Sequence, residues 1–214
     1  TADVVASYIH GGGRIGVLVA GNGASDDAAK EALTNIAMQI AAMNPQYISR
    51  DEISADELAK MKEITIDSAL NDPFSLPKPV LSKLIEKAVA GVWSAEDVAI
   101  YEEKKSNMNF LPNFLSKEAK AQLAEIACAD KEEISGNKIF SGLVEGRISK
   151  QMKEICLLDQ VYVKAEDGKQ TVAAYLKSVN PALKIAKFVR FEVGEGMEKK
   201  NEDFAAEVAK QMNV

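Results

Sequence analysis

Alternating apolar side chains mark the most strand-like stretch of the chain, residues 14–20 (RIGVLVA), close to its start. Every second residue from Ile15 to the end of this run is β-branched, which is the period-two pattern of a strand with one strongly apolar face. Three glycines precede the run at residues 11–13, and glycine adopts the positive φ values that tight reversals need. Because an aromatic and a β-branched residue also stand upstream, the pattern predicts a β-hairpin over residues 8–20.

A second strongly strand-like run, residues 185–193 (IAKFVRFEV), lies near the far end of the sequence. A two-stranded hairpin is only marginally stable by itself, so a further strand or a helix must cover it. We therefore predict that this run pairs with the hairpin. In that arrangement the two ends of the chain form one domain, the middle is an insertion, and His10 and Arg14 flank the turn of the hairpin.

Between these strands the apolar spacing changes to the threes and fours of amphipathic helices, and Ser54 and Glu57 have the spacing of a capping box. The predicted fold class is α+β, with a small antiparallel sheet packed with helices and interrupted by a large all-helical insertion. Residues 1–55 and 156–214 are assigned to the core and residues 56–155 to the insertion, whose first and last helices are expected to lie antiparallel, side by side. The expected helices lie near 26–43, 55–64, 79–91, 95–101, 117–128, 139–155, 171–179 and 201–212, with a short strand or extended stretch at 157–163.

The composition argues against several classes of binding partner. With 26 basic and 32 acidic side chains the formal net charge is −6, which argues against a protein that binds nucleic acid by neutralising phosphates. No apolar run reaches the roughly 18 residues of a membrane span, and no secretory signal opens the chain, so we expect a cytoplasmic protein. Cys128 and Cys156 lack metal-ligand spacing and His10 is the only histidine, so no metal site is expected and both cysteines are predicted to be reduced, packed thiols.

The glycines of the hairpin also match a dinucleotide-binding pattern. Gly11, Gly13 and Gly16 satisfy G-x-G-x-x-G, but in a dinucleotide site that motif follows a strand and opens a helix. Here a strand follows it instead. A dinucleotide-dependent enzyme is therefore the weakest of three functional hypotheses, and no cofactor is predicted.

His10 is the candidate residue for any chemistry that needs imidazole. As the only histidine, it would have to carry a general-base or triad mechanism, yet no serine or cysteine is linked to it by a nucleophile motif. A contact with a partner protein and a structural role, such as capping backbone groups, are both left open. We interpret the chain as a binding protein rather than an enzyme.

Two other groups of residues are interpreted as structural. An acidic cluster near the C-terminus is interleaved with lysines, which is typical of a solvated turn at a helix start rather than of a cation site. Three aromatic residues of the insertion are expected to pack rather than to stack on a base. The acidic cluster comprises Glu192, Glu195, Glu198, Glu202 and Asp203, and the aromatic residues are Trp93, Phe110 and Phe114.

Four stretches of the sequence resemble bacterial translation elongation factor Ts. They are YIHGGGRIGVLV, IAMQIAAMNPQYISRDEI, EGRISKQMKEICLLDQVYV and FVRFEVGEGMEKKNEDFAAEVAKQ, and they follow the order of that family. The last stretch is the most specific of the four. The resemblance implies a factor of protein biosynthesis that is not an enzyme: it binds the GTPase elongation factor Tu and promotes release of GDP, which is guanine-nucleotide exchange.

Two residues carry over from the motifs of this family. The histidine of its Y-x-H-G segment is similar to His10 and is expected to touch the third domain of elongation factor Tu. The valine of its Q-x-F-V-like segment corresponds to Val163 and is expected to add apolar contact. The small N-terminal helical domain of the family and its T-D-F loop have no counterpart, which implies a fragment or a chain whose start was removed. Residues 66–138 stand where the family has its helical dimerisation hairpin and look like an enlarged version of it.

The alternative function is a helical self-association or interaction module without exchange activity. It rests on the enlarged insertion and on the near-heptad spacing of the helix that closes it. Under this hypothesis the chain forms a homodimer through the helical insertion. Neither a membrane nor a direct nucleic-acid partner is expected in either case.

Overall fold

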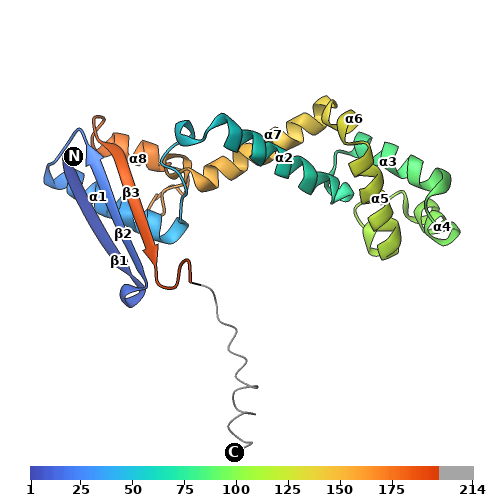
Figure 1. Ribbon diagram of the computed structural model, residues 1–214, viewed down its shortest axis with the longest axis horizontal. Helices are drawn as coiled ribbons and strands as arrows, with labels where there is room; N and C mark the ends of the chain where they lie inside the picture. The colour runs from blue at the N-terminus through green and yellow to red at the C-terminus, as the bar shows by residue number, and fades with distance from the viewer. Residues whose placement is uncertain (198–214) are drawn as a thin grey trace, which may run out of the picture. The chain divides into compact units, whose positions relative to one another are not determined.

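The computed structural model describes residues 1–197, in which the chain divides into two compact units. One unit comprises residues 1–44 together with the chain from residue 162 onward, and the other comprises residues 45–161 (Figure 1). The helix predicted at 201–212 and three members of the acidic cluster, Glu198, Glu202 and Asp203, lie outside the described residues.

A three-stranded antiparallel sheet in the order β1-β2-β3 forms the first unit (Figure 1). β1 (Val4–His10) and β2 (Ile15–Asn22) make the predicted hairpin. β3 (Lys184–Glu192) pairs with the other edge of β2, with a bulge between Ala20 and Gly21. This pairing confirms that both ends of the chain contribute to one sheet, and with it the α+β fold class.

The turn of the hairpin depends on its glycines. Residues 11–13 form a short 3-10 turn in which φ is 60°, 67° and 95° in order. Side chains with a Cβ atom adopt such values only with strain, so three consecutive glycines give the chain a reversal that few other sequences allow.

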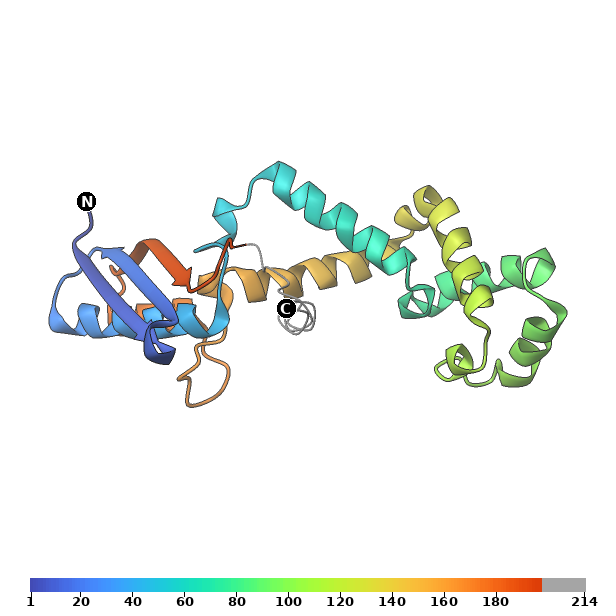
Figure 2. The ribbon, with the colours of Figure 1, turned by 60° about the horizontal axis from the view of Figure 1, so that its bottom comes forward.

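α1 (Asp27–Met43) packs on one face of the sheet and contacts both β1 and β2 (Figure 2). Its N-cap is Asp26, whose carboxylate accepts a hydrogen bond from the Ala29 N–H at 2.9 Å, so the helix begins one residue after the expected position. A negative charge at this end also complements the helix dipole, which favours aspartate over the serine beside it.

The core of the first unit lies between α1 and the sheet. Its buried apolar side chains on the helix keep the predicted spacing of threes and fours, but Met43 is exposed because it stands at the end of the helix beyond the sheet contact. Asn44 ends the helix with a positive φ of 46°, directly before Pro45. The buried side chains are Val4, Ala6, Val17 and Val19 of the sheet and Ala29, Leu33, Ile36 and Ile40 of the helix.

α8 (Val172–Val179) completes this unit by packing against α1. Thr171, the predicted first residue of this helix, is its N-cap and accepts a hydrogen bond from the Ala174 N–H at 3.2 Å. Tyr175 of α8 stacks on Tyr162 with ring centroids 4.1 Å apart, so the chain that enters the unit at residue 162 is held to the helix. Together with burial, the hydrogen bond between the two phenols raises the pKa of Tyr162.

The second unit is built from helices joined by short turns (Figure 2). α2 (Ala55–Leu70) begins at the predicted capping box: the Ser54 hydroxyl accepts from the Glu57 N–H at 3.2 Å, and the Glu57 carboxylate accepts from the Ser54 N–H at 2.9 Å. α2 contacts the last helix of the unit, α7 (Lys138–Ile155), and the two run in opposite directions as predicted. The helices between them are α3 (Lys78–Gly91), α4 (Ala95–Lys104), α5 (Lys117–Ala129) and α6 (Lys131–Ser135).

One apolar core joins α3 and α5 to the end of α2 and the start of α7. Trp93 lies in it as predicted, and its indole N–H donates to the Ala119 carbonyl oxygen at 2.9 Å. Phe110 and Phe114 do not: they are 58% and 51% exposed, so the prediction that they pack was wrong. The loop that carries them buries Leu111 and Leu115 instead, which occupy the inward positions.

The chain enters and leaves the second unit along adjacent paths. Leu157 N–H donates to the Tyr47 carbonyl oxygen at 2.9 Å, and Tyr47 and Cys156 form a single parallel bridge. Leu157–Asp159 is a 3-10 turn, so the short strand or extended stretch predicted for residues 157–163 does not begin at residue 157. The apolar residues there favour a strand, but a single bridge pairs too little backbone to extend one.

The two cysteines differ from each other in their surroundings. Both are free thiols; Cys156 is buried, and burial raises its pKa, which keeps the thiol protonated and unreactive. Cys128 is exposed on α5, so the prediction that it packs was wrong. Among the residues that the structure describes, no helix is both long and apolar enough to cross a membrane.

Asp97 is a buried carboxylate that ties the starts of two helices together. It accepts hydrogen bonds from the Ser116 N–H at 2.9 Å and from the Ser116 and Ser94 hydroxyls at 2.8 Å each, and these serines cap α5 and α4. Burial by itself would raise the pKa of Asp97, but the three hydrogen bonds outweigh it and hold the pKa below its ordinary value.

We expect Asp97→Asn to lower the unfolding free energy of the second unit by about 1–3 kcal/mol at neutral pH, because charge-assisted hydrogen bonds to buried groups are lost. Since the folded pKa is depressed, this contribution is complete above the ordinary aspartate pKa of about 3.9 and is lost as the pH falls through the folded value. Trp93 is the only tryptophan, so its fluorescence reports on this unit during urea unfolding. A difference between wild type and variant that stays constant down to about pH 3 would contradict the assignment.

Candidate functional site

The face of β1 that packs on α1 becomes progressively exposed toward the turn of the hairpin. Val4 and Ala6 are buried, Tyr8 is half-buried and His10 is exposed, although all four share one face of the strand. His10 therefore stands where the helix no longer covers the sheet, at the free end of the hairpin. The structure places the sequence-predicted histidine where a partner can reach it.

A hollow of about 530 Å³ opens beside His10. The strand register explains its lining, because His10 lies opposite Ile15 and Ile15 lies opposite Glu192. Two of the lining residues are joined by a backbone hydrogen bond from Val193 N–H to the Arg14 carbonyl oxygen at 2.9 Å. Its lining residues are His10, Gly11, Arg14, Ile15, Glu192 and Val193.

His10 is held by its neighbour on the same face of the strand. The Tyr8 hydroxyl lies 3.0 Å from His10 Nδ1, and the two ring centroids are 5.9 Å apart. Because one ring nitrogen is engaged, Nε2 is the nitrogen left for an outside partner.

Glu192, on the third strand, is held in a similar way. Its carboxylate accepts a hydrogen bond from Arg190 Nη1 at 2.8 Å, and the Arg190 side chain is only 10% exposed. Arg190 Nε is buried and has no hydrogen-bond partner within the described part of the chain. The ion pair with Glu192 therefore matters to a guanidinium that is largely removed from water.

Val163, the second predicted contact residue, belongs to the same unit as His10 and is 48% exposed. Its backbone N–H donates to Gln39 Oε1 at 2.8 Å, which fixes it beside the last turns of α1. The structure thus places Val163 near the C-terminal half of the helix and His10 at the turn of the hairpin. Both are accessible side chains of one unit.

The sheet face opposite α1 carries a row of exposed apolar side chains. The register brings Leu18 of the central strand between Ser7 and Val189, with Gly16 between Ile9 and Phe191 in the next row. Antiparallel sheets commonly leave one face in water, but that face is then usually polar. The exposed members of this row are Val5, Ile9, Leu18 and Phe191.

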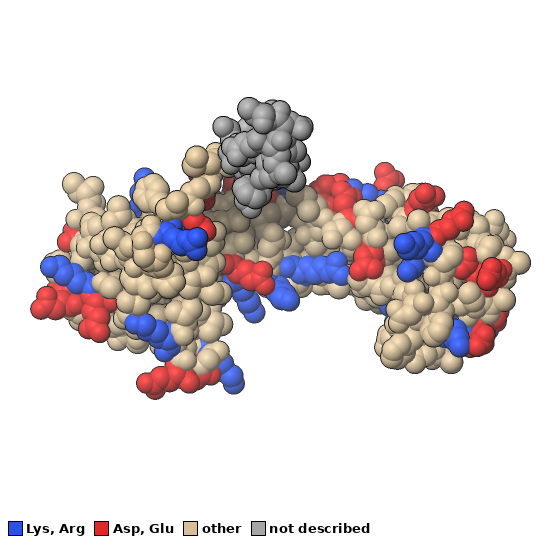
Figure 3. All heavy atoms as spheres, turned by 90° about the horizontal axis from the view of Figure 1, so that it is seen from below, with Lys and Arg blue, Asp and Glu red and all other residues tan. Residues whose placement is uncertain are grey.

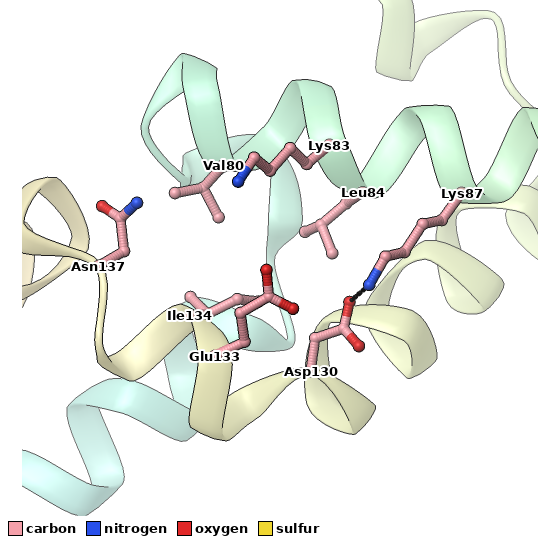
Figure 4. Close-up of a pocket in the computed structure, with 8 residues that line it drawn as sticks. All are labelled: Val80, Lys83, Leu84, Lys87, Asp130, Glu133, Ile134 and Asn137. Atoms are coloured by element: carbon pink, nitrogen blue, oxygen red, sulfur yellow. Dashed lines mark hydrogen bonds and ion pairs between the residues drawn. The ribbon is translucent and has the colours of Figure 1, made fainter.

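A second, much smaller hollow lies between α3 and α6 in the second unit (Figure 4). Val80, Leu84 and Ile134 form its apolar wall, and Lys87 makes an ion pair with Asp130 across it. That hydrogen bond raises the pKa of Lys87. With a volume of about 50 Å³ the hollow holds no more than a few waters, so we assign it a packing role.

Lysines, arginines and acidic residues are interspersed on the face shown in Figure 3, without a large field of one sign. Within residues 1–197 no group of three or more His, Cys, Asp or Glu side chains has the geometry to hold a metal ion. The site at the hairpin end combines one imidazole, one carboxylate, one guanidinium and apolar side chains on a rigid sheet edge. Such a surface is suited to contact with another protein.

The sequence predicts His10 and Arg14 at the turn of the hairpin, but it does not show that Tyr8 and Glu192 lie beside them. Tyr8 and His10 are two apart on a predicted strand, and this spacing alone indicates that their side chains share a face. Glu192 was assigned to a solvated acidic cluster; only the register between β2 and β3 shows that it lines the same hollow. That register is regular from Ile15 to Ala20, but no local pattern shows which residue of the distant strand pairs with Ile15.

Comparison with known proteins gives a consistent match. The family model for elongation factor TS matches residues 1–195. An elongation factor Ts of Clostridioides difficile is 36% identical over 215 residues, covering 99% of this chain and 51% of that protein. Proteins of the same name from Desulforamulus reducens and Alkaliphilus metalliredigens are 35% and 37% identical, and the chain covers 72% of each. The chain thus spans about half of the first relative and nearly three quarters of the other two.

We expect Glu192→Ala to lower the unfolding free energy of the first unit by about 1–2 kcal/mol, because Arg190 then keeps a largely buried guanidinium without its carboxylate. Urea unfolding followed by circular dichroism measures the change. Glu195→Ala, which removes an exposed carboxylate three residues further on, is the matched control and is expected to have almost no effect. Equal effects of the two substitutions would contradict a structural role for the ion pair.

Proposed function

This chain belongs to the elongation factor Ts family, and on that premise we propose that it binds the GTPase elongation factor Tu and promotes the release of GDP from it. The observation that carries the proposal is the exposed His10 at the free end of the hairpin, on the one segment where the family motif Y-x-H-G has its counterpart. Val163, exposed on the same unit, is proposed to add apolar contact.

An exchange factor works by linkage rather than by covalent chemistry. It must bind the nucleotide-free GTPase more tightly than the GDP-bound form, so that its binding shifts the GTPase toward nucleotide release. Reciprocity then requires GDP to weaken the protein complex by the same factor. A protein with this task needs a surface of the right shape, and the end of a hydrogen-bonded three-stranded sheet supplies one.

The side chains around His10 fit this task. The His10 imidazole, the Glu192 carboxylate and the Arg14 guanidinium offer hydrogen-bonding groups around a hollow, and Ile15 and Val193 add apolar area. Interfaces commonly combine a few well-placed polar groups with such apolar contacts. We propose that this hollow receives a protruding segment of elongation factor Tu.

We expect His10→Ala to weaken the complex with nucleotide-free elongation factor Tu by about tenfold, and Val163→Ala by less, in line with the loss of one hydrogen bond or a few apolar atoms at an interface. Calorimetry measures the binding, and release of a fluorescent GDP analogue measures exchange. Because the His10 side chain is exposed, the thermal melt is expected to be nearly unchanged.

Cys128→Ala, a truncation at an exposed position of the second unit, is the control for these assays and is expected to leave binding intact. A chain that forms no detectable complex with nucleotide-free elongation factor Tu would refute the binding proposal. A large drop in melting temperature for His10→Ala would instead assign this residue a structural role.

A second candidate function is self-association through the helices of the second unit, giving a homodimer without exchange activity. The observation that favours it is the exposure of large apolar side chains on α2 and α7, where Ile64 is 68% and Ile139 is 54% exposed. Apolar positions on exposed helix faces often mark contacts with another chain.

If the second candidate is right, the intact chain sediments as a dimer at micromolar concentration and Ile64→Glu converts it to a monomer, because a charge cannot be buried unpaired at low cost. Gln151→Glu introduces the same charge at an exposed polar position of α7 and is expected to leave the dimer intact. A monomeric mass for the wild-type chain over the whole concentration range would rule this function out.

A further inference from the structure

We propose that Tyr8 is a positioning residue that holds His10 in the tautomer with its proton on Nε2. His10 then presents an N–H donor at the end of the hairpin, and the group that it meets on the partner is a hydrogen-bond acceptor, namely a main-chain carbonyl or carboxylate oxygen. The binding part of this inference rests on the proposed function, whereas the tautomer is a property of the free chain.

The contact between the two side chains follows from the strand itself. Residues two apart on a strand point to the same side, and Tyr8 and His10 lie on a strand whose every residue is paired with β2. The hydroxyl therefore reaches Nδ1 at 3.0 Å without any rearrangement of the backbone. Tyr8 is half-buried at the edge of the helix cover, so its ring is held while its hydroxyl faces the imidazole.

The direction of this hydrogen bond decides the tautomer. A phenol O–H is a stronger proton donor than the N–H of a neutral imidazole, and an unprotonated imidazole nitrogen is a stronger acceptor than a phenol oxygen. The Tyr8 O–H accordingly donates to Nδ1. In a neutral ring with Nδ1 as acceptor the proton is on Nε2, so Nε2–H becomes the donor that faces outward.

The other polar groups at the hollow do not compete for this role. Glu192 is the nearest carboxylate in the register, but Ile15 stands between it and His10, and its Oε2 accepts from Arg190 at 2.8 Å. Arg14 could compete only by donating to Nε2, and the hydrogen bond that the structure shows at the imidazole is the one between the Tyr8 hydroxyl and Nδ1. The hydroxyl of Tyr8 is the group placed to select the tautomer.

Long-range proton–nitrogen correlation spectra test the tautomer directly. Because His10 is the only histidine of the chain, the imidazole signals need no assignment. At a pH where the ring is neutral, we expect the wild-type chain to show the pattern of the Nε2–H tautomer, with Nδ1 shifted as a hydrogen-bonded acceptor. Tyr8→Phe is expected to move the spectrum toward a mixture of tautomers. A dominant Nδ1–H form in the wild type, or a spectrum that Tyr8→Phe leaves unchanged, would overturn the proposal.

Binding to nucleotide-free elongation factor Tu supplies the second readout. We expect Tyr8→Phe to weaken the complex about two- to tenfold, the effect of one lost hydrogen bond. The same substitution in a His10→Ala background is expected to have no further effect, since its action passes through the imidazole. If Tyr8→Phe weakens binding equally in the wild-type and His10→Ala chains, Tyr8 contacts the partner itself and the proposal is overturned.

Replacements of His10 locate the donor. The glutamine amide falls near the position of Nε2 and the asparagine amide near that of Nδ1, so His10→Gln is expected to retain more binding than His10→Asn. Tyr47→Phe is the matched control, because it removes an exposed phenol that donates to Glu57 at 3.1 Å in the other unit. It is expected to change neither the spectrum nor the binding.

The two readouts separate the two claims. If the chain fails to bind elongation factor Tu, the proposed function falls, and the spectra still decide whether Tyr8 sets the tautomer. If the chain binds but His10→Asn binds as well as His10→Gln, the function stands and the donor assignment is overturned.

Discussion

The first unit depends on the pairing of β2 with β3. β1 and β2 are joined by a short turn, so their pairing is local in the sequence. β3 comes from the far end of the described chain, and its pairing with the other edge of β2 is a long-range contact. Without it, β2 would be an edge strand and the hairpin a marginal two-stranded ribbon. The same pairing sets Glu192 opposite Ile15, and the backbone hydrogen bond from Val193 to Arg14 continues it to the next lining residues of the hollow. The fold of the first unit and its candidate site therefore depend on the same strand pairing.

Local signals predicted those parts of the fold that local chemistry decides. Serine caps, a capping box and a glycine turn each work within four residues, and Ser54, Ser94, Ser116 and the glycine turn at residues 11–13 behave as their types dictate. Exposure is different, because it depends on what packs nearby. Phenylalanine is a residue type that usually lies in a core, yet Phe110 and Phe114 are exposed and Leu111 and Leu115 take the inward positions of the same loop.

The candidate site was predictable only in part, because its surroundings depend on residues that are distant in the sequence. The sequence offers His10 as the sole imidazole and family resemblance offers it as a contact, but neither shows the hollow beside it. Glu192 and Arg190 become neighbours of the site because β3 pairs with β2 so that Glu192 lies opposite Ile15 and Arg190 opposite Val17. A pattern of alternating residues reports which side chains share a face, not which residues of a distant strand stand opposite.

The hydrogen bonds where the second unit begins and ends have a consequence for how such chains diversify. Because the backbone at Tyr47 is bonded directly to that at Leu157, the entry and exit of this helical arm are adjacent, and a short loop could join them. Closing a longer excursion costs only about 0.6 kcal/mol for each doubling of its length. The number and length of the helices between these two residues can therefore change at low entropic cost while the hydrogen-bonded entry and exit stay in place.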